Sequence, residues 1–175
     1  MAEAFNERRL PADRERRYEE LAGEIAAVLE GEPDLIARMA TVAAMLAQSF
    51  PRFFWTGFYR ADRSRPGELV AGPYQGTLGC LRIAMGKGVC GTAAAERRVV
   101  IVPDVDAFPG HIACDSRSRS EIVLPVADAS GELIAVLDVD STEPAAFDEL
   151  DAEWLGRILE QTFGASRPEP PPSAA

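Results

Sequence analysis

The three cysteines are the most reactive side chains of this sequence, and Cys114 has the surroundings that best suit a nucleophile. His111 precedes it closely, and Arg117 and Arg119 follow in the same polar segment. Cationic neighbours favour the thiolate, which is the nucleophilic form of cysteine. A buried, inert thiol is the alternative interpretation, and the polar character of the segment argues against it.

Cys80 and Cys90 lie on either side of a Gly-Lys-Gly segment. We place Cys90 in the first turn of a short helix, where the helix dipole favours a thiolate and the free N–H groups suit an anion. The alternative is that each is a small buried hydrophobic residue. The number of cysteines is odd, and the N-terminal residues lack the apolar stretch of a secretory signal. We therefore expect no structural disulfides, and we expect the cysteines to have a redox role.

Three carboxylates are predicted to converge at one end of a β-hairpin. If Asp128 pairs with Gly131 in a tight turn, Glu121 lies opposite Asp138, and Asp140 follows on the same face. Like charges at this distance repel, so a metal ion, a cationic ligand or a shared proton must compensate. The alternative is a solvated rim of the sheet. A one-residue change of register would separate the faces.

A metal site would draw on these carboxylates together with His111 and Cys114, which are suitable ligand types. No CxxC or HExxH spacing supports it, and we predict no metal. An aromatic strand supplies a different feature: Trp55 and Tyr59 lie on one face, with Gly57 between them. The glycine leaves a gap that suits a small apolar group, and ordinary sheet core is the alternative.

The elements that position these residues are helices at both ends of the chain and hairpin-linked strands between them. Apolar periodicity and caps predict helices over 13–30, 34–49, 89–96 and 148–164, and strands over 53–59, 68–75, 80–85, 99–102, 120–127 and 132–140. A long loop, 103–119, carries Cys114. The pattern indicates an α+β domain with a central, mainly antiparallel sheet flanked by N-terminal and C-terminal helices. We assign 13–164 to this domain, 1–12 to a flexible extension and 165–175 to a disordered tail.

The length and charge of the chain limit its function. Its 175 residues suit one domain, and a formal charge of −10 opposes non-specific binding of nucleic acid or anionic membranes. The sequence has no apolar run long enough for a bilayer. We therefore expect a cytoplasmic protein with neither nucleic acid nor a membrane as partner.

Taken together, the motifs resemble those of the free methionine-(R)-sulfoxide reductases, a family built on the GAF domain. The matching segments run from Trp55 to Ser141. They are Trp55-Thr-Gly-Phe-Tyr59, Gly72-Pro-Tyr-Gln-Gly76, Gly86-Lys-Gly-Val-Cys-Gly91, Val102-Pro-Asp-Val105, Phe108-Pro-Gly-His-Ile-Ala-Cys-Asp115, Ser120-Glu-Ile-Val123 and Leu137-Asp-Val-Asp-Ser141. All three cysteines fall on cysteine positions of the family. Asp106 and Tyr74 depart from its usual residues.

The resemblance implies a GAF fold, usually a homodimer, that reduces free methionine-(R)-sulfoxide. It implies that Cys114 is the nucleophile and that Cys80 and Cys90 are the resolving cysteines, with Cys80 favoured. It assigns the substrate pocket to Trp55, Tyr59, Glu121, Asp138 and Asp140. No cofactor is implied, and a thioredoxin-like protein would supply the electrons. A non-catalytic GAF module that binds a regulatory ligand is the main alternative, and a metal-dependent hydrolase is another.

Overall fold

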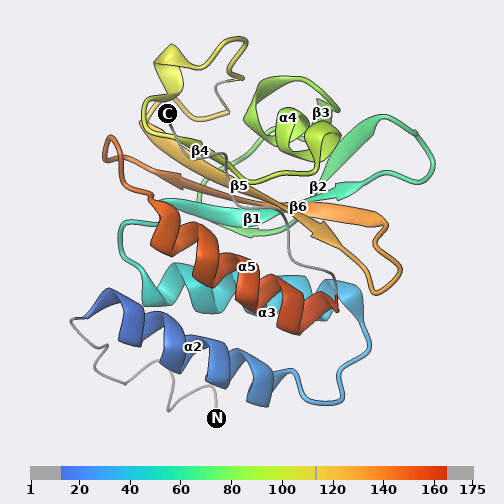
Figure 1. The fold of residues 1–175 in the computed structure, drawn as a ribbon. Helices are drawn as coiled ribbons and strands as arrows, with labels where there is room; N and C mark the ends of the chain where they lie inside the picture. Colours follow the sequence, from blue (N-terminus) through green and yellow to red (C-terminus); the bar gives the residue numbers. More distant parts are fainter. Residues whose placement is uncertain (1–12, 113, 165–175) are drawn as a thin grey trace.

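A six-stranded antiparallel sheet forms the centre of the protein, with two long helices against one face, a third long helix packed outside these two, and a short helix and long loops on the other face (Figure 1). The computed structural model describes residues 13–112 and 114–164. The predicted N-terminal extension, 1–12, and the predicted tail, 165–175, lie outside the described residues. The expected α+β class and the antiparallel sheet are confirmed.

The three long helices begin where the sequence places capping aspartates. They are α2 (Arg14–Val28), α3 (Leu35–Ser49) and α5 (Glu149–Phe163). Asp13, Asp34 and Asp148 each accept a backbone N–H of the first turn, which satisfies one of the donors that a helix start leaves free. Gly164 ends α5 in the left-handed conformation, as predicted.

The strands are short and pair with antiparallel neighbours throughout. They are β1 (Trp55–Ala61), β2 (Glu68–Gln75), β3 (Arg82–Ala84), β4 (Val100–Val102), β5 (Ser120–Ala127) and β6 (Leu133–Ser141), in the spatial order β3-β2-β1-β6-β5-β4. The short helix α4 (Gly88–Glu96) packs on β5 and β6, and a 3₁₀ turn (Val105–Ala107) follows β4. Among the described residues, no helix is both long and apolar enough to cross a membrane.

Alternation along the strands divides the core into two layers. Phe58, Ile122 and Leu137 pack with the three long helices, whereas Tyr59 and Val123 face α4. The helix-side layer is the larger of the two. Because successive side chains of a strand point to opposite faces, Glu121, Asp138 and Asp140 lie on the α4 side.

The register of the β5–β6 hairpin differs from the prediction by two residues. Glu121 lies opposite Asp140, and Asp138 lies opposite Val123. Asp128 pairs with Glu132, which leaves Gly131 (φ 82°) as an extra residue in the turn, and a second irregularity follows at Val126/Ala127. Each irregularity moves the register by one residue. Two steps restore the original face, so the carboxylates still gather on one side.

A buried ionic group ties the helical layer together. Asp151, on the first turn of α5, is fully buried and accepts a hydrogen bond of 2.8 Å from the Tyr18 hydroxyl of α2. Arg14 of α2 lies 3.2 Å from the same carboxylate, and Arg52, just before β1, also pairs with it. The pairing compensates for the burial of the charge and fixes α2 against α5.

Candidate active site

Three adjacent strands bring the predicted site residues into one row. In β1, β6 and β5, Trp55 pairs with Asp140, and Asp140 pairs with Glu121. The next row of the same face holds Gly57 opposite Asp138. These side chains, together with Tyr59, Cys90, His111 and Cys114, line one pocket between the sheet, α4 and the loops.

Of the three carboxyl groups in these two rows, those of Glu121 and Asp138 are largely removed from water and that of Asp140 is half-buried. Glu121 and Asp138 are each 6% exposed. Burial raises the pKa of both well above its ordinary value, and repulsion from neighbouring carboxylates adds to the increase. Burial also raises the pKa of Asp140 to about 6, although a hydrogen bond from Ser118 opposes the change. The sequence predicted one raised pKa from crowding, and the structure gives all three.

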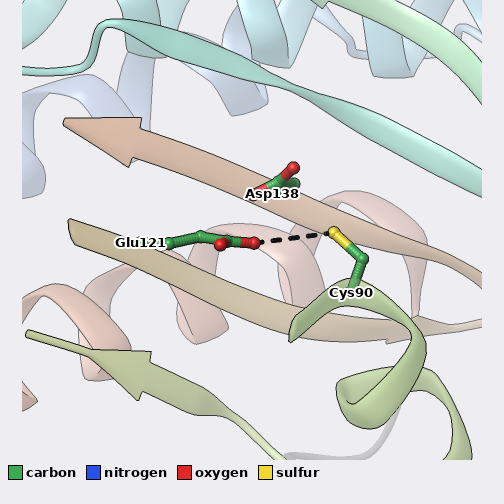
Figure 2. A group of neighbouring side chains, drawn as sticks. All are labelled: Cys90, Glu121 and Asp138. Carbon is green, nitrogen blue, oxygen red and sulfur yellow. Dashed lines mark hydrogen bonds between the residues drawn. The ribbon is translucent and has the colours of Figure 1, made fainter. Parts of the chain in front are cut away.

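Cys90 lies beside two of these carboxyl groups. Figure 2 shows its sulfur directed at Glu121, with Asp138 on the neighbouring strand. The thiol donates to Glu121 Oε1 at 3.8 Å. Burial raises the pKa of Cys90 well above its ordinary value, and the charges of Asp138 and Glu121 raise it further. The expectation of a thiolate at Cys90 is therefore wrong, because burial and like charge outweigh the helix dipole.

The same three side chains have the composition of a small metal-binding group. Ligand atoms of Cys90, Glu121 and Asp138 all lie within 4.8 Å of one another. Of the other ligands considered from the sequence, His111 Nε2 lies 3.8 Å from Glu121 Oε2, and Cys114 is held in a disulfide. Burial lowers the pKa of His111 below its ordinary value, which favours the neutral imidazole.

A disulfide joins Cys80 to Cys114, with the two Cα atoms 5.3 Å apart. Cys114 is exposed and Cys80 is half-buried, whereas Cys90 keeps a free, buried thiol. The bond connects the loop before β3 to the long loop before β5. The sequence predicted a redox role for the cysteines rather than a structural disulfide. The observed disulfide is accessible to solvent at Cys114, and exposed disulfides are typical of redox-active pairs.

The predicted gap beside Gly57 is filled. Trp55 stacks on Tyr59 with ring centroids 5.6 Å apart and on Tyr74 with centroids 5.1 Å apart. A Cβ at Gly57 would lie 2.2 Å from the Cβ of Tyr74 and 2.9 Å from the Trp55 ring, so Tyr74 of β2 and Trp55 occupy the space above the glycine. A small apolar group therefore cannot rest between Trp55 and Tyr59, and the expectation of a gap there is wrong.

The stacked rings instead support the loop that carries Cys80. A Cβ at Gly79 would lie 2.9 Å from the Tyr59 hydroxyl and 3.1 Å from Trp55 Cζ2, so only glycine fits this close approach. The indole N–H of Trp55 donates to the Thr77 carbonyl at 3.0 Å. The sequence did not identify Thr77, Gly79 or Ser118, the partner of Asp140, as site residues. The only available signal was the glycine directly before Cys80, which is consistent with close packing of this loop on the rings of Trp55 and Tyr59.

Helix α4 presents its N-terminus to the same pocket. Gly88 and Val89 line it, and among the described residues no side chain caps this helix. The first-turn N–H groups and the helix dipole therefore favour an anion there, as the sequence suggested. The cavity volume left between all these side chains is about 30 Å³, room for only a few water molecules.

Comparison with known proteins agrees with this geometry. The family profile of the GAF domain matches residues 31–162. GAF domain-containing protein A of Dictyostelium discoideum is 50% identical over 146 residues, which cover 83% of this chain and 90% of that protein. The free methionine-R-sulfoxide reductase of Escherichia coli is 40% identical, over 82% of this chain and 85% of its own.

A solved structure extends the likeness to three dimensions. The free methionine-R-sulfoxide reductase of Neisseria meningitidis, in complex with its substrate, is 46% identical and superposes with a TM-score of 0.84. The match covers 89% of this chain and 92% of that chain. The fold is thus a GAF domain, which defines the class. The chain belongs to the family of the free methionine-R-sulfoxide reductases.

Proposed function

We propose that this protein reduces free methionine-(R)-sulfoxide to methionine, with Cys114 as nucleophile and Cys80 as resolving cysteine. The observation that carries the proposal is the solvent-accessible Cys80–Cys114 disulfide beside a pocket lined by the buried carboxyl groups of Glu121 and Asp138 and the half-buried one of Asp140. Relatives named as free methionine-R-sulfoxide reductases support the choice of substrate.

Both charged ends of a free amino acid have complementary groups in the pocket. Asp138 Oδ1 is buried without a hydrogen-bond partner in the part of the chain that the structure describes. An ammonium group supplies that donor and compensates for the charge of the carboxylate row. The substrate carboxylate suits the uncapped start of α4.

The reaction needs a thiolate, an acid and a second thiol. The Cys114 thiolate attacks the sulfoxide sulfur, and one of the carboxyl groups with raised pKa protonates the departing oxygen. The oxygen then transfers to the Cys114 sulfur as the sulfur–oxygen bond of the substrate and the new bond between the two sulfurs break, so methionine leaves and Cys114 becomes a sulfenic acid. The Cys80 thiol then forms the disulfide and releases water. An external dithiol, of the thioredoxin type, restores both thiols by exchange.

The small cavity that remains in the disulfide form indicates the order in which methionine is released and the disulfide forms and opens. Ligand pockets usually enclose about 300–1,000 Å³, whereas this one leaves about 30 Å³. Methionine must therefore leave before the disulfide closes, and the disulfide must open before the next sulfoxide enters. A homodimer and a cytoplasmic location stay predictions from the resemblance and the sequence.

Single-turnover and steady-state measurements test the proposal. Cys114→Ser should abolish turnover without unfolding, because a hydroxyl forms no sulfenic acid. Cys80→Ser should release one methionine per chain and then stall. Near-normal turnover by Cys114→Ser would refute the nucleophile. A Cys90→Ser variant that stalls while Cys80→Ser cycles normally would transfer the resolving role to Cys90.

A further inference from the structure

The two loops that carry the disulfide are also joined by a hydrogen bond beside it. Thr77 lies three residues before Cys80, and Asp115 directly follows Cys114. The Thr77 hydroxyl donates to Asp115 Oδ2 at 2.7 Å. The same two loops are thus connected twice, once by the covalent bond between the sulfurs and once by this contact.

The Asp115 side of the contact is fixed by Arg117. The guanidinium donates to Asp115 at 3.0 and 2.8 Å, and the backbone N–H of Arg117 donates at 2.9 Å. These hydrogen bonds, with a smaller contribution from Thr77, hold the pKa of Asp115 well below its ordinary range. The acceptor is therefore ionised at neutral pH, and an ionised acceptor makes a stronger hydrogen bond than a neutral one.

Both sides of the contact rest on the start of β1. The carbonyl of Thr77 accepts the indole N–H of Trp55 at 3.0 Å. The guanidinium of Arg117 lies 4.6 Å from the centre of the Phe54 ring, an attractive arrangement of a cation on an aromatic face. Phe54 and Trp55 are consecutive residues, so both anchors lie on one short segment that carries neither cysteine of the disulfide.

We propose that Thr77, Asp115 and Arg117 form a clasp that keeps Cys80 close to Cys114 while the disulfide is open. This rests on the proposed function, since it makes the three residues positioning residues for the capture of the Cys114 sulfenic acid. The capture forms the sulfur–sulfur bond and releases the sulfenic oxygen as water. Holding two reacting groups together raises their effective concentration, so a clasp favours the intramolecular disulfide over reaction with other thiols.

The thiol–disulfide equilibrium tests the clasp without any sulfoxide. Full-length protein is equilibrated with reduced and oxidised glutathione, and the fraction of Cys80–Cys114 disulfide is measured after acid quenching. Thr77→Val should lower the equilibrium constant for disulfide formation about threefold to tenfold, because it removes one partly exposed hydrogen bond. Thr77→Ser keeps the hydroxyl, so its equilibrium constant for disulfide formation should be close to that of the wild type. Thr142→Val, at an exposed threonine after β6, is the matched control.

An unchanged constant in Thr77→Val, or equal losses in Thr77→Val and Thr142→Val, would overturn the clasp. Because no sulfoxide is present, this result is independent of whether the protein turns that substrate over. Failure of the clasp can therefore be distinguished from failure of the proposed reductase function.

A second measurement asks whether the clasp persists without the disulfide. The chain has two tryptophans, so the indole N–H signal of Trp55 can be assigned in nitrogen-15 spectra by substituting Trp154. In Cys80→Ser the Trp55 signal should stay near its position in the oxidised protein, and adding Thr77→Val should move it. If Cys80→Ser alone moves the signal as far as the double variant does, the clasp opens with the disulfide and the proposal fails.

Discussion

Replacing Asp140 by asparagine should change how the stability of the protein depends on pH. Asp140 of β6 pairs with Trp55 of β1 on one side and with Glu121 of β5 on the other. Burial is the main cause of its raised pKa, and Asp115 adds to it. The asparagine side chain has nearly the same shape and can still accept the hydrogen bond from Ser118, so Asp140→Asn removes the charge and little else.

The size of the effect follows from the pKa of about 6 against an ordinary value of 3.8. One pKa unit corresponds to about 1.4 kcal/mol, so the full contribution is roughly 3 kcal/mol before solvent screening. A pKa raised by folding means that the native state holds its proton more tightly. The contribution is complete below the unfolded pKa and is lost as the pH rises through 6. About 2 kcal/mol of it falls between about pH 4.5 and 7.5.

Urea unfolding of the oxidised protein at about pH 4.5, 6 and 7.5 would measure this. The free energy of unfolding of the wild type should fall by roughly 2 kcal/mol more than that of Asp140→Asn over this range. At the highest pH the variant should be the more stable protein. Asp106→Asn, at an exposed position of the 3₁₀ turn, should follow the wild type. Parallel pH profiles of the wild type and Asp140→Asn would show that Asp140 is not held in a charge-excluding environment.

Four further results are expected. Calorimetry should detect methionine-(R)-sulfoxide binding to Cys114→Ser, which forms no disulfide and does not react, but not to the oxidised wild type, and equal affinity would contradict the ordering of steps. N-acetyl-methionine-(R)-sulfoxide should have a kcat/KM at least about tenfold lower than the free amino acid, because it lacks the ammonium group; equal values would refute the ammonium site. Asp151→Ala should lower the free energy of unfolding by about 3 kcal/mol, since Arg52 and the Tyr18 hydroxyl lose their partner, and a change below about 1 kcal/mol would show that the ionic group is dispensable. Turnover should survive dialysis against a strong chelator, whereas loss restored by a divalent ion would assign a metal to Cys90, Glu121 and Asp138.

The sequence predicted the elements well because their signals are local. Capping aspartates at 13, 34 and 148 fixed the helix starts, and turn residues bounded the strands. The face of each carboxylate was also predictable, because strand alternation survives a register change of two. The register itself depended on Gly131 acting as an extra turn residue, which strand pattern alone does not reveal.

The misjudged site features depend on contacts between distant segments. The gap at Gly57 is closed by Tyr74 of the neighbouring strand, and Gly79 packs the Cys80 loop onto the rings of Trp55 and Tyr59. The proton on Cys90 follows from burial against Glu121 and Asp138, which the helix position alone did not indicate. In each case the deciding partner lies far away in the sequence.

Turnover of free methionine sulfoxide tests the central claim most directly. Purified protein is supplied with dithiothreitol and, separately, with the (R) and (S) sulfoxides of free methionine, and methionine release is measured for the wild type and Cys114→Ser. The structure and its relatives predict repeated turnover of the (R) epimer by the wild type alone. Absence of methionine release from the (R) epimer by the reduced wild type, or equal release by Cys114→Ser, would contradict it.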